Sequence, residues 1–76
     1  PCVWLVDGNR NNCISIKENL SFLNVKIKAF HSGVAFLEAF DKKSTGCLLL
    51  EAHLPDMNGL EILRILVAQG VRLPIL

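Results

Sequence analysis

Short apolar blocks recur along this chain of 76 residues at nearly even intervals. They begin at Val3, Val25, Cys47 and Leu73, which gives spacings of 22, 22 and 26 residues. Each interval accommodates one strand, one helix and two short loops, as in β-α-β units with parallel strands and right-handed crossovers. The spacing therefore predicts an α/β fold in the order β-α-β-α-β-α-β.

The segments between the blocks carry helix signals. We expect three helices, over residues 11–23, 34–40 and 60–68. The first has apolar residues at steps of three and four, as on one face of a helix: Cys13, Ile16, Leu20 and Leu23. Ser32 is the expected N-cap of the second helix. Asn58 and Glu61, three residues apart, resemble a capping box at the start of the third.

The character of each strand indicates its place in the sheet. Residues 3–6 and 47–50 are continuously apolar, which is typical of central strands covered on both faces. Lys26 and Lys28 alternate with apolar residues over 25–30, so this strand belongs at an edge, where charge discourages pairing with another chain. We therefore predict the strand order 2-1-3-4, in a flavodoxin-like doubly wound parallel sheet with three α/β/α layers.

Composition and charge exclude several classes of protein. Apolar residues make up 51% of the chain, which excludes a disordered tail. The chain has 8 Lys and Arg against 7 Asp and Glu, so its charge does not favour direct contact with nucleic acid or an anionic membrane. No apolar run approaches the roughly 20 residues of a membrane span. No basic leader precedes the first strand, so we expect a cytoplasmic protein.

The cysteines and histidines of the chain are not spaced as the ligands of a metal site. They are Cys2, Cys13, Cys47, His31 and His53. We expect buried free thiols in a reducing cytosol and histidines that lie in loops. Because Cys2 and Cys47 would begin neighbouring strands, a bridge between them is conceivable. Trp4, in the first strand, is expected in the core.

The acidic residues that follow two of the strands are the best candidates for chemistry. Asp7 and Gly8 follow the first strand, and Glu51 follows the third. Ligands of doubly wound sheets bind beyond the carboxyl ends of the strands. Two carboxylates there suit Mg²⁺, and a carboxylate beside such an ion can accept a phosphoryl group. The alternative is that Asp7 and Glu51 only cap helices or lie solvated at loop starts.

One motif carries a family resemblance. Val6-Asp7 closes the first strand, and residues 54–59, Leu-Pro-Asp-Met-Asn-Gly, lead from the third strand into the third helix. This pattern resembles the receiver domain of two-component response regulators. The stretch from His31 to Leu37 resembles more specifically the receivers that are joined to a helix-turn-helix DNA-binding domain. The resemblance covers residues 1–76, which would form the N-terminal part of a receiver and end in its fourth strand.

The resemblance implies a phosphotransfer site and partners. A sensor histidine kinase would donate a phosphoryl group to an Asp after the third strand, and Mg²⁺ would join that Asp to an acidic pair after the first. The backbone carbonyl of His53 would complete the metal site. The rest of the protein would supply a DNA-binding output domain, while this chain would contact no nucleic acid and catalyse no reaction of its own.

The chain departs from the family at the chemical positions. Glu51 stands where the family has the acceptor Asp, and Gly8 where it has a second, metal-ligating acid. A misplacement of the order of 1 Å can cost about 10² in rate. We therefore expect Mg²⁺ binding by Asp7 and Glu51 to be weak or lost, with no cofactor required. Our hypothesis is a degenerate receiver that acts independently of phosphorylation.

Three other interpretations stay open. The chain could be an interaction or dimerisation module, with an apolar edge exposed beside the fourth strand at residues 48–50 and 73–76. It could also be a still-active Mg²⁺-dependent phosphoacceptor. Asp56 could be a substitute acceptor, although a turn residue after Pro55 is the simpler interpretation.

Overall fold

The computed structural model describes residues 2–41, 43–71 and 75 of the chain. Strands and helices alternate in the predicted order, with a 3-10 turn (η1) after the first helix: β1 (Cys2–Val6), α1 (Arg10–Leu20), η1 (Ser21–Leu23), β2 (Lys26–Phe30), α2 (Gly33–Ala39), β3 (Cys47–Leu50) and α3 (Gly59–Ala68). The strands are parallel and lie in the order β2-β1-β3, which confirms the predicted arrangement of the first three.

The predicted fourth strand falls mostly outside the described residues. Within it, Ile75 forms an isolated parallel bridge with Leu48 of β3. Because Leu48 pairs with Trp4 of β1 as well, Ile75 lies on the far side of β3, where the fourth strand was expected. The prediction of an exposed apolar edge at residues 48–50 is wrong for Leu48, which is fully buried.

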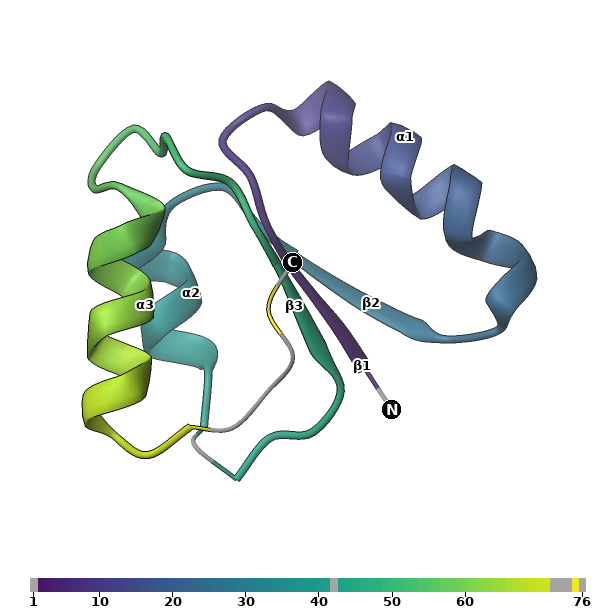
Figure 1. The fold of residues 1–76 in the computed structure, drawn as a ribbon. Coiled ribbons are helices and arrows are strands. Elements are labelled where there is room, and N and C mark those ends of the chain that lie inside the picture. The colour runs from purple at the N-terminus through teal and green to yellow at the C-terminus, as the bar shows by residue number, and fades with distance from the viewer. Residues whose placement is uncertain (1, 42, 72–74, 76) are drawn as a thin grey trace.

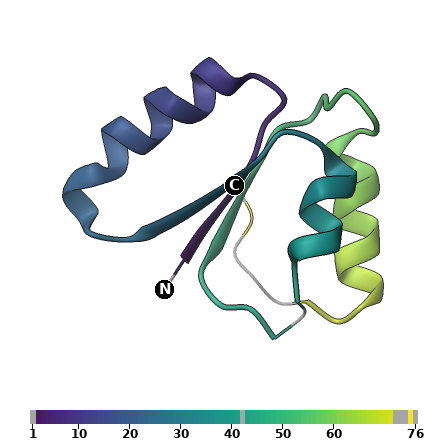
Figure 2. The same cartoon turned by 180° about the vertical axis from the view of Figure 1, so that it is seen from behind.

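Helices cover both faces of the sheet. Helices α2 and α3 lie side by side on one face, and α1 lies alone on the other (Figure 1). The view from behind shows the same three layers (Figure 2). This arrangement follows from right-handed crossovers on either side of the central strand β1.

The core lies between the sheet and the α2–α3 layer. Six buried residues form it: Trp4, Val6, Phe36, Leu48, Ile62 and Leu66. Four of the five aromatic residues pack there, since the ring of Trp4 stacks on Phe30 and meets Phe36 and Phe40 edge-on. The indole N–H of Trp4 donates to the carbonyl of Thr45 at 3.2 Å. Trp4 is therefore a core residue, as predicted.

Helix α1 is packed less closely than its sequence pattern predicted. Of the expected apolar face only Cys13 is buried, and Leu23, in the 3-10 turn, is 48% exposed. The helix is also shorter than predicted, because the backbone tightens at Ser21 and Asn24 then adopts the left-handed conformation (φ 54°). Its start is at Arg10, because the Asn9 side chain accepts the N–H groups of Asn11 and Asn12.

All three cysteines are free thiols, as predicted. Cys13 is buried, as predicted, but the prediction of burial is wrong for Cys2 and Cys47, which begin their strands and are only half-buried. The register of the sheet pairs Cys47 with Val3 rather than with Cys2. The conceivable bridge between Cys2 and Cys47 is therefore absent.

Candidate functional site

Asp7 and Glu51 lie at the carboxyl ends of neighbouring strands. Val6 and Leu50 are partners in the parallel register, and the Glu51 N–H donates to the Val6 carbonyl at 2.9 Å. Asp7 and Glu51 line one cavity of about 180 Å³ on the α1 side, together with five apolar residues: Leu5, Val6, Ile16, Leu49 and Leu50. The fold thus brings the two carboxylates to one edge of the sheet, 44 residues apart in sequence.

The Asp7 carboxylate is engaged by the segment that leads into α1. One oxygen accepts the Asn9 N–H at 2.9 Å, and the other is 3.5 Å from the side-chain nitrogen of Asn12. Asp7 is only 9% exposed. It therefore stabilises the turn after β1, in addition to any role it has toward a ligand.

The Glu51 side chain bends back toward its own loop. One carboxylate oxygen accepts the backbone N–H of His53 at 3.3 Å. The loop then returns to the strand end, where the Gly59 N–H donates to the Ala52 carbonyl at 2.8 Å. A Cβ on Gly59 would lie 2.6 Å from the Glu51 carbonyl oxygen, so this close approach of α3 to β3 requires glycine.

Gly8 lies under Pro55. A Cβ built on Gly8 would lie 3.0 Å from Cδ of Pro55 and 3.7 Å from the carbonyl oxygen of His31. An aspartate at this position would require the proline ring to move by a few tenths of an ångström. The loop after β3 therefore covers the place where a second carboxylate would begin.

The loop after β3 is held at both of its ends. His53 and Asn58 form an isolated antiparallel bridge, and the Leu54 N–H donates to the Met57 carbonyl at 3.1 Å. Asn58 and Glu61 form the predicted capping box, in which each side chain accepts the other residue's backbone N–H. The bridge and the capping box together define the path of residues 53–58.

Asp56 has a contact that the sequence did not reveal. Its two carboxylate oxygens accept the N–H groups of Gly33 and Val34, at 2.8 and 2.9 Å. The Gly33 N–H, and next the Val34 N–H, lower the pKa of Asp56. Asp56 is therefore more than a turn residue, because it caps α2 from another loop. Its partners lie 23 and 22 residues earlier in the chain, so no local pattern predicts them.

His31 lies behind Asp7. Its Nδ1 is 3.1 Å from the Asp7 carbonyl oxygen, and the Cys13 sulfur lies 3.7 Å from that same oxygen and from Nδ1. Burial, and next the charge of Asp7, raise the pKa of the Cys13 thiol. His31 lies in the loop between β2 and α2, as predicted, and the sequence did not reveal its contacts with Asp7 and Cys13. His53 lies in the loop after β3 and is exposed.

The comparison with protein families identifies the family of this chain. Residues 3–76 match the model of the response regulator receiver domain. The chain belongs to this family. In its sequence the receiver is 28% identical over 74 residues to the response regulator protein TmoT of Ectopseudomonas mendocina, covering 97% of this chain and 34% of that protein. It is 34% identical over 74 residues to the response regulator MprA of Mycobacterium ulcerans, covering 97% of this chain and 32% of that protein.

Solved structures agree with this assignment. The receiver resembles the response regulator StyR with a TM-score of 0.93 and 28% identity, covering 100% of this chain and 38% of that one. A response regulator receiver protein from Pseudoalteromonas atlantica has a TM-score of 0.88 and 32% identity, with 99% of this chain and 63% of that one covered. The chain thus spans about a third of the length of its curated relatives. Within its described residues, every helix is too short or too polar to span a bilayer.

The donor set at the acidic edge does not fit a tightly held Mg²⁺. Such an ion takes six oxygens and is held by one or two carboxylates with phosphate and water. Here both carboxylates already accept N–H groups, and Gly8 supplies none. Over residues 2–41, 43–71 and 75, no three His, Cys, Asp or Glu side chains gather as a metal site.

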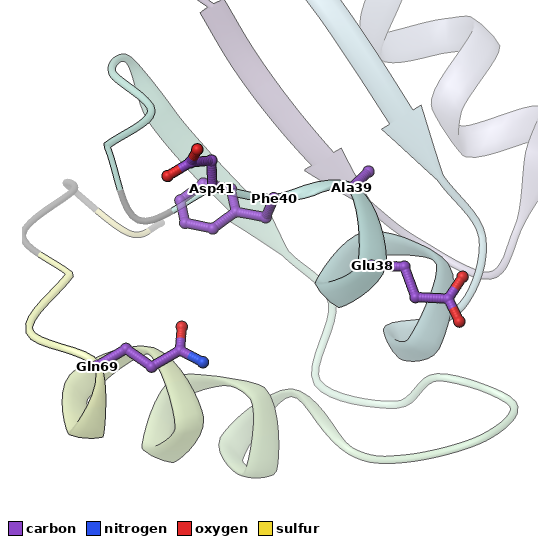
Figure 3. A pocket seen from close by; sticks show the side chains of 5 residues that line it. All are labelled: Glu38, Ala39, Phe40, Asp41 and Gln69. Atoms are coloured by element: carbon purple, nitrogen blue, oxygen red, sulfur yellow. The ribbon is translucent and has the colours of Figure 1, made fainter.

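A larger hollow lies at the opposite end of the receiver. It has a volume of about 620 Å³ and is lined by residues at the ends of α2 and α3: Glu38, Ala39, Phe40, Asp41 and Gln69 (Figure 3). The Glu38 side chain points away from Asp41 and Gln69 (Figure 3). Its polar groups do not converge, so this hollow is no candidate for chemistry.

Proposed function

We propose that this receiver is degenerate and regulates its output without Mg²⁺-dependent phosphorylation. The observation that carries the proposal is the pair of residues at the acidic edge. Glu51 occupies the acceptor position and Gly8 the position of the second acid, and the two follow neighbouring parallel strands. A phosphoacceptor site needs both an aspartate at the right depth and enough anionic oxygens to hold the metal.

The geometry around Gly8 supports the loss of metal binding. Pro55 covers the place where a carboxylate at residue 8 would start, and the Asp7 carboxylate accepts hydrogen bonds from Asn9 and Asn12 at the turn into α1. With one of three carboxylates missing and the other two each accepting an N–H group, a divalent ion gains little from this edge. We propose that the receiver functions with no cofactor and has no catalytic activity.

Glu51 offers a fixed negative charge instead. Its carboxylate extends one methylene further than an aspartate and stays at the strand end whatever the state of a kinase. The Glu51 carboxylate imitates a phosphoryl group only in part, because its charge is −1 whereas a phosphate group carries roughly −1.5 to −2. In this proposal the receiver has a constant signalling state, and its regulation comes from binding another protein.

We further propose the setting in which the receiver acts. A sensor histidine kinase or another signalling protein is its binding partner in the cytoplasm. The part of the protein outside this chain holds a DNA-binding output domain, through which the receiver regulates transcription. The support for this setting is the family, in which the relatives named above are response regulators.

Intact-mass spectrometry after incubation with acetyl phosphate and Mg²⁺ tests the proposal. We expect no phosphorylated species from the wild-type protein. In a separate test, we expect no response of its amide spectrum to beryllofluoride, a mimic of phosphate, added with Mg²⁺. The double variant Gly8→Asp with Glu51→Asp is the matched positive control, since it restores both family residues. Stoichiometric phosphorylation of the wild type would instead identify a still-active phosphoacceptor, and the proposal would be wrong.

Light scattering tests the alternative of a dimerisation module. A receiver that regulates through a different partner is expected to be monomeric at micromolar concentration. A stable dimer, unchanged by Gly8→Asp with Glu51→Asp, would favour the interaction module over the proposed signalling role.

A further inference from the structure

Three consecutive residues of the loop after β3 contact two other loops at the carboxyl edge. Pro55 lies on Gly8, in the loop after β1. Asp56 binds the N–H groups of Gly33 and Val34, at the start of α2. We call residues 55–57 the clasp, because together they join all three loops that follow the described strands.

Met57 completes the clasp on the same backbone. A Cβ built on Gly33 would lie 2.2 Å from the Met57 sulfur and 3.1 Å from Cδ1 of Ile62. In the observed conformation the Met57 side chain fills the place that a Cβ at residue 33 would take, and Gly33 itself is buried. Asp56 and Met57 therefore hold one backbone segment by a charge-assisted contact and a packing contact, so the position of the clasp depends on α2.

Two side chains cap α2, Ser32 from the position directly before the helix and Asp56 from the loop after β3. Ser32 accepts the Ala35 N–H at 3.1 Å, as an ordinary N-cap does. Asp56 accepts the two preceding N–H groups, which have no partner within the helix. Because ionised acceptors form the stronger hydrogen bonds, Asp56 is well suited to hold the loop after β3 against α2.

We propose that Asp56 is the positioning residue of the acidic edge. By holding residues 55–57 on α2, it keeps Pro55 over Gly8 and so sets the space around Asp7 and Glu51. Asp56 touches neither of these carboxylates and acts only through Pro55. A displacement of α2 would therefore move the loop beside Glu51, which couples this helix to the acidic edge. The inference goes beyond the proposed function and does not depend on whether the receiver is phosphorylated.

The contact depends on the charge of Asp56. The Gly33 and Val34 N–H groups bind the ionised carboxylate and hold its pKa below the ordinary value of 3.8. The groups that lower this pKa are all backbone N–H groups, including those of Asp56 and Met57. The clasp is therefore complete above pH 3.8 and is lost as the pH falls through the lowered pKa of the native protein.

Nuclear magnetic resonance of the intact protein, labelled with ¹⁵N-glycine, tests the inference. The readouts are the nuclear Overhauser contact between Pro55 and Gly8 and the amide shifts of Gly8 and Gly33. In Asp56→Ala we expect the contact to be lost and both amides to shift. The matched control is Ser32→Ala, which removes the other cap of α2 and is expected to leave the contact between Pro55 and Gly8 in place.

Two further measurements keep the test decisive if Asp56→Ala does not fold. In the wild type, the Gly33 amide should titrate with an apparent pKa below 3.8, and Asp56→Asn should abolish this titration. The weakening of the contact between Pro55 and Gly8 should follow the same titration. A contact that persists through the titration, or in Asp56→Ala, overturns the inference, and so does its loss in Ser32→Ala.

Discussion

The two faces of the sheet are packed very differently, although the sequence gives each an amphipathic helix. On one face α3 buries Gly59, Ile62 and Leu66 against the core. On the other face α1 buries only Cys13, and Ile14 is 54% exposed. The difference shows that an apolar stripe determines which side of a helix turns inward but not how much of it is covered. Coverage depends on neighbouring elements, and α3 has α2 beside it whereas α1 is alone on its face in the described structure (Figure 1).

The largest expected difference between the two faces of the sheet is in the loss of stability when one aromatic side chain on each face is truncated. Phe36 is fully buried among other rings, so Phe36→Ala is expected to lower the free energy of unfolding by about 3–5 kcal/mol. Phe22, in the 3-10 turn η1 after α1, is 79% exposed. Phe22→Ala is expected to change the free energy of unfolding by no more than about 0.5 kcal/mol. Urea denaturation of both variants measures this. Equal losses would show that the α1 side is as well packed as the α2–α3 side.

Removal of the helix caps gives a smaller effect and sharpens the comparison. Asn58→Ala removes the capping box of α3 and should cost about 1 kcal/mol of global stability, since α3 holds the core. Asn9→Ala removes the acceptor of the Asn11 and Asn12 N–H groups. Because α1 is loosely packed, we expect Asn9→Ala to appear mainly as faster amide hydrogen exchange within α1. If Asn9→Ala lowered the global free energy of unfolding as much as Asn58→Ala, this expectation would be wrong.

The smallest expected effect is a difference in the alkylation rates of the cysteines, which depends on how closely α1 packs on the sheet. Cys13 is buried, and burial and the charge of Asp7 raise the pKa of its thiol. The thiolate is the reactive form, so Cys13 should react with iodoacetamide more slowly than Cys2 and Cys47, and its rate should rise only at higher pH. Peptide mapping after a timed reaction measures each rate. Fast alkylation of Cys13 near neutral pH would mean that α1 opens readily from the sheet.

Much of the fold followed from local pattern. The even spacing of apolar blocks predicted the order of elements, and the lysines of residues 25–30 predicted that β2 is an edge strand beside β1. The capping box at Asn58 and Glu61 was also predicted, because its two residues are only three apart. The length of α1 was overestimated, since the pattern of apolar residues continues to Leu23 although the helix ends at Leu20.

The candidate site was predictable only in part. Asp7 and Glu51 could be placed together, because parallel neighbouring strands end at the same edge of a sheet. The environments of these residues could not be predicted. The bend of Glu51 toward the His53 N–H depends on side-chain and loop geometry, and the place of His31 behind Asp7 depends on how β2 ends beside β1.

The sequence by itself determined the parallel architecture, the family and the residues at the acidic edge, since these depend on hydrophobic periodicity and on residue identity. Only the tertiary structure decided the sparse packing of α1, the cover of Pro55 over Gly8 and the attachment of Asp56 to α2. The physical reason is distance along the chain. A hydrogen bond or close contact between residues more than twenty positions apart leaves no periodic signal, and it exists only once the strands have aligned the loops that carry them.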